Sequence, residues 1–197
     1  FASIIYGWYS GLVYLTPILG GWIADRMLGK KRTVVIGALL MSSGHLAMTF
    51  DQSFLLALAL LILGSGCLKG NISAQVGTLY PRDAASMRDR GFAIFSTGIN
   101  IGAASGPIVT GAVYAMYGYH AGFAVAAGLM LVALVVYLTG QKHLPETPPQ
   151  QVAQIAKQPL TPIERRQVIA LIAVIVTIGG FVWEAAFRAD LRDGGRL

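Results

Sequence analysis

The sequence predicts an all-α protein that crosses a membrane several times, and two observations lead to this prediction. Of its 197 residues, 55% are hydrophobic and only 12% are charged, whereas a soluble domain carries about 25% charged residues. The charges lie in short bands between long apolar runs, so most apolar side chains must face lipid. The same composition excludes a disordered chain, and the single cysteine, Cys67, excludes a disulfide scaffold.

Six apolar stretches are long enough to be membrane-spanning helices. A helix needs about 20 residues to cross the roughly 30 Å hydrocarbon core of a bilayer. The stretches are 6–24, 33–50, 54–79, 92–116, 122–140 and 168–187. Each is apolar around its whole circumference, whereas a helix that lies on the membrane surface has a charged face.

The connections between these stretches alternate in charge. Segment 25–32 contains four Lys or Arg residues, 80–91 contains three and 141–167 contains four, whereas 51–53 and 117–121 contain none. Alternate loops lie on opposite sides of a membrane, so the basic loops are expected in the cytoplasm. The formal charge of +6 is then explained by membrane topology, and a nucleic-acid partner is not needed to account for it.

The last connection divides the chain. Segment 141–166 is long and rich in proline and glutamine, which is typical of a linker between two helical groups. Residues 1–140 then form the first group, and 167–187 form the first helix of the next. Segment 188–197 becomes abruptly polar, and we expect it to come from a truncated or shifted reading frame.

The linker ends with a helix-start pattern. Thr161 is in place to be the N-cap, Pro162 to occupy the first helical position, and Glu164 to lie three residues after the cap. This is the arrangement of a capping box, in which the Thr and Glu side chains each satisfy the other's backbone N–H. A helix is therefore predicted to begin near Pro162, with one turn before it enters the membrane.

Three polar residues on different helices lie at the same predicted depth. At 1.5 Å per residue, Lys69, Tyr14 and Asn100 are about 15, 16 and 13 Å from the cytoplasmic ends of their helices. A lysine at that depth costs about 2.5–3.5 kcal/mol and needs a polar cavity or a partner. Taken singly, the tyrosine could serve only for packing, the asparagine could form a hydrogen bond between helices, and the lysine could belong to an ion pair with a purely structural role. Together the three favour a central site for a polar or anionic small molecule.

Other features favour packing over chemistry. Gly98, Gly102, Gly106 and Gly111 follow the small-residue spacing that lets membrane helices approach closely. The sequence has no metal-ligand cluster, no phosphate-binding loop and no pair of nucleophile and base. We therefore expect no catalytic residues, no metal and no cofactor, and the chain is not expected to be an enzyme.

One loop resembles a superfamily signature. The segment 21–32, Gly-Trp-Ile-Ala-Asp-Arg-Met-Leu-Gly-Lys-Lys-Arg, is similar to the G-x-x-x-D-R-x-x-G-R/K-R/K loop of major facilitator transporters, between their second and third helices. The resemblance implies a partial major facilitator fold with about six transmembrane helices. It assigns a gating and topology role to the motif residues Gly21, Asp25, Arg26, Gly29, Lys30, Lys31 and Arg32.

Two further segments resemble one family within that superfamily. Segment 95–103 is similar to the F-Y-x-x-I-N-x-G signature of the proton-dependent oligopeptide transporter family, and 64–73 is similar to that family's G-x-G-x-x-K-P-N-x-S segment. The likeness covers residues 1 to about 187. It implies helices two to seven of a protein with twelve or more helices, and it makes the proline-rich linker the connection between two six-helix bundles.

The resemblance implies a function as well. Members of the family couple inward proton flow to uptake of di- and tripeptides by alternating access, in a bacterial inner membrane. By position, Tyr14, Lys69 and Asn100 match residues of the substrate pocket. The partners expected are a di- or tripeptide, the lipid bilayer and a second six-helix bundle that completes the pocket. The proton is the coupling ion, and no cofactor is implied.

Some family features differ in this chain. The E-x-x-E-R-F proton motif of the first helix is expected to precede residue 1. Trp183-Glu184 and Phe187-Arg188 stand where the family has W-x-x-F/Y-E-Q, and Gly70 replaces a usual proline. We therefore expect the isolated chain not to transport. Two alternatives stay open: a major facilitator transporter of another small solute, and a non-transporting gene remnant.

Overall fold

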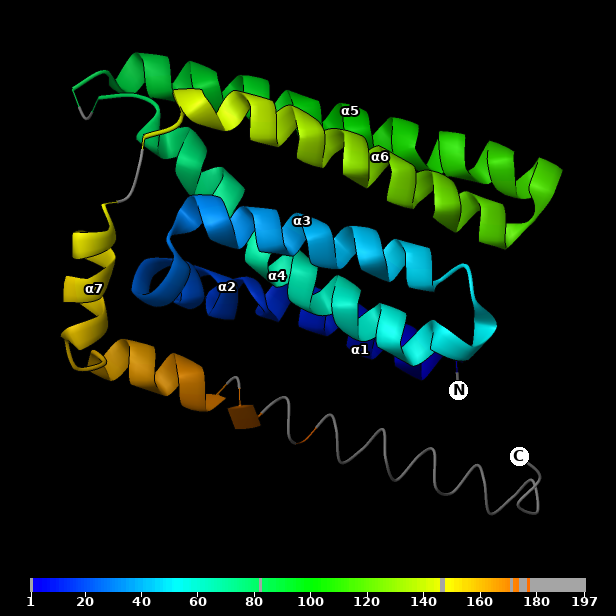
Figure 1. The fold of residues 1–197 in the computed structure, drawn as a ribbon, viewed down its shortest axis with the longest axis horizontal. Helices are drawn as coiled ribbons and strands as arrows, with labels where there is room; N and C mark the ends of the chain where they lie inside the picture. Colours follow the sequence, from blue (N-terminus) through cyan, green and yellow to red (C-terminus); the bar gives the residue numbers. More distant parts are fainter. Residues whose placement is uncertain (1, 82, 146–147, 171, 174–176, 178–197) are drawn as a thin grey trace.

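The computed structural model describes residues 2–81, 83–145, 148–170, 172–173 and 177, and this part of the chain is helical with no strand (Figure 1). The all-α prediction is therefore confirmed. The elements in chain order are α1 (Ala2–Leu15), α2 (Pro17–Ile23), the π-helical turn η1 (Ala24–Leu28), α3 (Lys30–Ala47), the 3-10 turn η2 (Asp51–Ser53), α4 (Phe54–Thr78), α5 (Ala85–Tyr117), α6 (Tyr119–Gly140), the 3-10 turn η3 (Gln141–His143) and α7 (Pro149–Lys157). A further helical segment covers 162–170.

Three helices of the described chain are long and apolar enough to cross a membrane by themselves, namely Phe54–Thr78, Ala85–Tyr117 and Tyr119–His143. The other predicted spans differ for local reasons. Span 6–24 is divided at Thr16, because Pro17 has no backbone N–H and so begins a new helix. Span 33–50 becomes a helix that starts at Lys30, so basic residues occupy its first turn. Span 168–187 lies mostly outside the described residues.

The interruption at Thr16 is small. The Thr16 backbone N–H donates to Leu12 O at 2.8 Å, and the Gly20 N–H donates to Thr16 O at 3.0 Å. The hydrogen-bond ladder thus passes from α1 into α2 across the proline. The two helices together cover the stretch that the sequence predicts as a single span.

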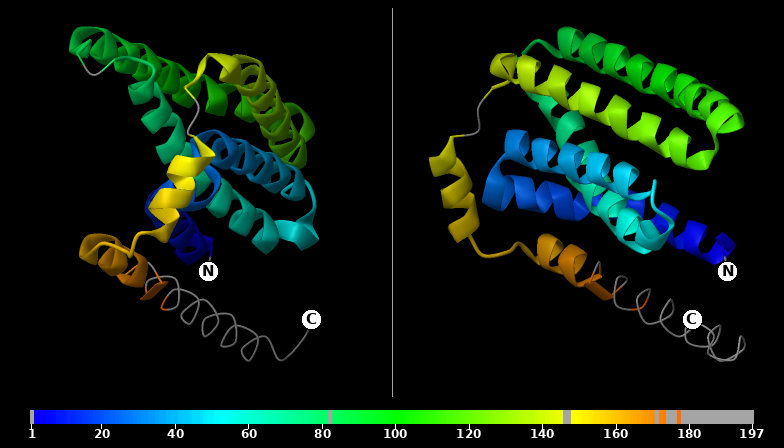
Figure 2. Two further views of the ribbon diagram at one scale, coloured as in Figure 1. Left: turned by 60° about the vertical axis from the view of Figure 1, so that its left-hand side comes forward. Right: turned by 45° about the vertical axis from the view of Figure 1, so that its right-hand side comes forward.

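The connections gather at two ends of the bundle. In Figure 1 the turn between η1 and α3, the α4–α5 connection and the end of α6 lie at the same end, where α7 also lies. The α3–α4 connection and the α5–α6 turn lie at the other end. The views of Figure 2 show the same arrangement, with α5 and α6 as an adjacent hairpin. The three basic connections therefore share one side, as their charge pattern predicts.

Helix α4 is held closely against α2 and α3 by glycines. A Cβ added at Gly20 of α2 would meet the Gly66 carbonyl, and its carbonyl carbon would lie only 2.5 Å away. A Cβ at Gly37 of α3 would lie 2.8 Å from Gly64 O. Backbone meets backbone at both crossings, so no larger residue fits without moving a helix.

The small-residue packing predicted on span 92–116 is wrong for the contacts within the described part of the chain. A Cβ added at Gly98, Gly102, Gly106 or Gly111 meets nothing within 4 Å. Helix α5 pairs with α6, and its contact there includes Gly122 of α6, which approaches Thr110 O. No helix of the described chain packs against the side of α5 that carries these four glycines.

Polar side chains in the interior join neighbouring helices. Asn71 Nδ2 of α4 donates to Gly20 O at 3.0 Å and to Cys67 O at 2.8 Å. Thr16 Oγ1 donates to Ile62 O at 3.1 Å. Such bonds are worth about 0.6 kcal/mol on average between membrane helices, and up to about 1.7 kcal/mol. They fix the rotation of α4 relative to α2, and so decide which side chains of α4 face outward.

Candidate substrate site and basic loop

Lys69 and Tyr14, on α4 and α1, come together in the structure. The Lys69 Nζ lies 5.1 Å from the centroid of the Tyr14 ring, which is the range of a cation–π contact worth about 0.5–1 kcal/mol at an exposed position. Tyr14 is 80% exposed and Lys69 is also exposed. The pair therefore lies on an open face of the bundle, where another molecule or helix can reach it.

The outward position of Lys69 follows from the contacts of Asn71. Successive residues of an α-helix are about 100° apart, so two residues separated by two positions point about 200° apart. Asn71 is buried against Gly20 of α2. Lys69 therefore points away from that contact and toward the face that Tyr14 occupies.

Asn100 is exposed on α5, and in the part of the chain that the structure describes no hydrogen bond joins it to Lys69 or Tyr14. The structure thus brings Lys69 and Tyr14 of the predicted layer into contact, whereas Asn100 does not bond to either of them. Helix α4 also runs without interruption through Gly70. Glycine keeps the backbone N–H that the family's usual proline would lack, so position 70 does not break the helix beside Lys69.

The basic loop is built around the turn at Gly29. Its φ of 77° and ψ of 155° suit glycine, which has no Cβ to clash at positive φ. This turn ends η1 and starts α3, so the motif residues are divided between two elements. Gly21 is half-buried in α2, Asp25 is exposed on η1, and Lys30, Lys31 and Arg32 form the first turn of α3.

Arg26 is buried and joins the loop to the linker. Its guanidinium donates to Ile155 O at 3.2 Å and to Gln158 O at 2.7 Å, at the C-terminal end of α7. It also forms an ion pair with Glu164 at 3.0 Å. Carbonyls at a helix C-terminus attract cations, because they have no partner within the helix. One side chain thus connects η1, α7 and the start of the helix that follows.

Glu164 also completes the predicted capping box. Its carboxylate accepts hydrogen bonds from the Thr161 N–H and the Thr161 hydroxyl, each at 2.8 Å, and the Glu164 N–H donates to Thr161 Oγ1 at 3.2 Å. The helix start predicted from the sequence is confirmed. Hydrogen bonds from Thr161, with a smaller contribution from the Arg26 guanidinium, hold the pKa of the Glu164 carboxyl below its ordinary value.

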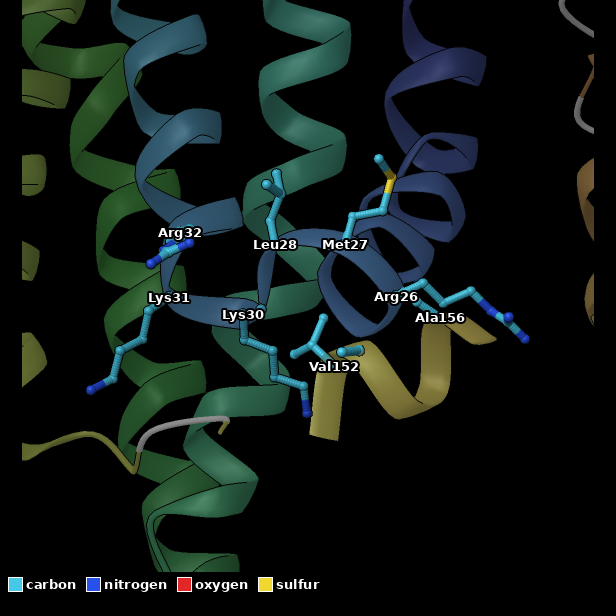
Figure 3. A pocket seen from close by; sticks show the side chains of 10 residues that line it. Arg26, Met27, Leu28, Lys30, Lys31, Arg32, Val152 and Ala156 are labelled. Atoms are coloured by element: carbon cyan, nitrogen blue, oxygen red, sulfur yellow. The ribbon is translucent and has the colours of Figure 1, made fainter. Parts of the chain in front are cut away.

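A cavity of about 420 Å³ lies between the basic loop and α7. It is lined by residues 26–32 and by Val152, Ala153 and Ala156. Figure 3 shows Val152 and Ala156 of α7 across from the turn, with the Arg26 side chain extending past Ala156. We call this cavity the basic pocket.

The contacts of Asn71 and Arg26 are the features that sequence reasoning missed. Asn71 belongs to the segment that resembles the family signature, and an amide in an apolar helix was a signal for an interhelical bond. Arg26 carried no signal for its partners, which are 129–138 residues away in the chain. Glu184 and the aromatic residues beside it lie outside the described residues. Among those that are described, no group of three His, Cys, Asp or Glu could hold a metal ion.

Comparison with known proteins agrees with the resemblance. A family model described as the POT family matches residues 31–158. A di-/tripeptide transporter of Lactococcus lactis subsp. lactis (strain IL1403) is 43% identical over 189 residues, which cover 91% of this chain and 36% of that protein. The uncharacterised transporter YclF of Bacillus subtilis (strain 168) is 42% identical over 140 residues, or 69% of this chain and 28% of YclF.

Solved structures give the same result. A crystal structure of a mutant peptide transporter POT in complex with alafosfalin is 36% identical, with a TM-score of 0.69, and the match covers 91% of this chain and 37% of that one. A POT family transporter in complex with 5-aminolevulinic acid is 31% identical, with a TM-score of 0.71, over 94% and 38% of the two chains. The matches therefore cover between 28% and 38% of the length of these relatives. These relatives are transporters and not enzymes, and this chain is a membrane protein that belongs to the POT family.

Proposed function

We propose that this chain is part of a proton-coupled transporter that takes up di- and tripeptides across the inner membrane. The name of the Lactococcus relative and the family membership support the peptide substrate. The division into residues 1–140, a linker at 141–166 and a following helix at 167–187 is part of the same proposal. The basic loops, which lie at one end of the bundle, are placed in the cytoplasm.

The observation that carries the proposal is the Lys69–Tyr14 pair. Its ammonium group lies over an aromatic ring near the predicted midplane, on a face that is open in this chain. A peptide has a carboxylate at one end, which an ammonium group attracts strongly in a site of low dielectric constant. Tyr14 keeps the cation in place and adds a hydroxyl that can donate to or accept from the peptide.

Asn100 is proposed to reach the peptide from α5. An amide side chain offers both a donor and an acceptor, which matches a peptide backbone. The open face would be closed by a second bundle, so that substrate lies between the two halves and rocking of the halves exposes it to either side. The 197-residue chain by itself is then not expected to transport.

The test uses the complete transporter that contains this chain, purified and reconstituted in liposomes with an imposed pH gradient. We expect labelled dialanine to accumulate when the outside is acidic, and unlabelled dialanine to compete while free alanine and nitrate do not. Competition by nitrate or an amino acid alone would favour the other major facilitator substrates. No uptake of any of these solutes would favour a non-transporting protein.

A further inference from the structure

The basic pocket lies outside the proposed peptide site and has its own chemistry. Its volume of about 420 Å³ is within the range of about 300–1,000 Å³ that ligand pockets usually have. One wall is the turn 26–32, and the other is one face of α7, more than a hundred residues later. The pocket thus exists only because the linker helix packs against the loop.

The charge of the pocket is one-sided. Arg26, Lys30, Lys31 and Arg32 line it, and no carboxylate is among the lining residues that the structure describes. Arg26 already has a counter-charge in Glu164. The carboxylate of Asp25 is a chain neighbour but is exposed and does not line the cavity. Lys30 and Arg32 therefore add positive charge to the pocket beyond the charge of Arg26, which Glu164 balances.

The start of α3 adds to this positive field. The helix begins at Lys30 behind Gly29, with no side-chain cap and no acidic residue in its first turn. The N-terminus of a helix carries a partial positive charge and favours anions, whereas three basic side chains at that position are unfavourable. Both the helix end and the side chains would be stabilised by an anion in the pocket.

The opposite wall is apolar. Val152, Ala153 and Ala156 of α7 line it. A small inorganic anion leaves this surface unused. A ligand with an anionic group next to an apolar part contacts both walls, which is the chemistry of a phospholipid at the membrane interface.

We propose that the basic pocket binds a phosphate group, carried by the headgroup of an anionic phospholipid, between the start of α3 and α7. The phosphate lies at the α3 N-terminus beside Lys30 and Arg32, and the upper acyl chain lies along the exposed residues Ala153 and Ala156 of α7. The lipid thereby joins the basic loop to the linker. This binding is independent of the peptide substrate, because the pocket and the Lys69–Tyr14 pair share no residue.

The test measures equilibrium binding of short-chain phosphatidylglycerol, short-chain phosphatidylcholine and inorganic phosphate to the full chain in neutral detergent. We expect saturable binding of one phosphatidylglycerol per chain. The double change Lys30→Gln with Arg32→Gln should weaken it about 30-fold, since each Lys or Arg near an anionic lipid surface contributes roughly a factor of five. Phosphatidylcholine should bind far more weakly than phosphatidylglycerol.

Two controls make the outcome decisive. Lys142→Gln with Arg165→Gln removes the same charge from exposed positions outside the pocket and should weaken binding less than threefold. Lys30→Arg with Arg32→Lys keeps the charge and should retain binding, which separates loss of the site from loss of folding. Equal weakening by the two Gln pairs would overturn the proposal. Inorganic phosphate binding as tightly as phosphatidylglycerol would assign the pocket to a soluble anion and overturn the lipid assignment.

Discussion

Replacing Gly20 by alanine tests the contact that fixes α2 against α4. The added Cβ would lie 2.5 Å from the Gly66 carbonyl carbon and 2.9 Å from Cys67 Cα, whereas non-bonded carbon atoms prefer about 3.5–4.0 Å. The obstacle is backbone and not the flexible end of a side chain. The two helices must therefore separate by about 1 Å before the methyl group fits.

The cost can be worked out from these contacts. Overpacking of this kind costs about 1–3 kcal/mol, and separation of the helices also strains the Asn71–Gly20 hydrogen bond, worth about 0.6 kcal/mol. The higher helix propensity of alanine returns at most about 1 kcal/mol. With the full propensity gain subtracted, we expect Gly20→Ala to lower the free energy of unfolding by about 0.6–2.6 kcal/mol.

The assay is unfolding in mixed micelles with increasing SDS, followed by circular dichroism. Gly128→Ala on α6 is the matched control, because a Cβ there meets nothing within 4 Å. Its stability should be unchanged or increased by up to about 1 kcal/mol. If Gly20→Ala were as stable as Gly128→Ala, the close α2–α4 crossing would be refuted.

Three further changes test other contacts. Spin labels at position 27 in η1 and position 154 in α7 should keep the same distance from pH 7 down to about 4.3, the ordinary pKa of Glu, and should separate only below it. The folded-state pKa of Glu164 is lowered. The stabilisation from the ionised carboxylate is therefore present above the ordinary pKa and is lost as pH falls through the folded-state pKa. Glu164→Gln, which keeps the capping geometry but not the charge opposite Arg26, should separate the labels already at pH 7. Asn71→Leu should destabilise the chain by about 0.6–1.7 kcal/mol in the SDS assay, because it removes the side-chain hydrogen bond between α4 and α2 while Gly20 O keeps the Ala24 N–H. Tyr137→Phe should cost about 0.6 kcal/mol through loss of the bond to Gln75, and an unchanged stability would exclude that bond.

The features that the sequence predicted well are those set by local chemistry. The Thr161–Glu164 capping box depends on residues within one turn, and the grouping of basic connections at one end follows from the alternation of apolar runs. The interruption at Thr16 was not predicted, although Pro17 was a signal for it. A hydropathy argument counts apolar residues and does not ask whether each residue can donate its backbone N–H.

Contacts between helices were harder to predict. Glycine spacing on α5 looked like a packing motif, yet the close approaches involve Gly20, Gly37 and Gly64 on other helices. Spacing shows which residues share a face of a helix and does not show whether another helix covers that face. For the same reason depth along the helices placed Lys69 and Tyr14 in one layer, but the distance between their side chains depended on the rotation of each helix.

The measurement that tests the central claim most directly is proton-driven accumulation of labelled dialanine by the complete transporter with Lys69→Ala. The account predicts that accumulation falls to the level of empty liposomes, while Lys142→Ala, which removes an exposed lysine outside the site, leaves it unchanged. Lys69→Arg should retain part of the activity, because it keeps the positive charge beside Tyr14. Normal accumulation by Lys69→Ala in correctly folded protein would contradict the proposed role of Lys69 in peptide binding.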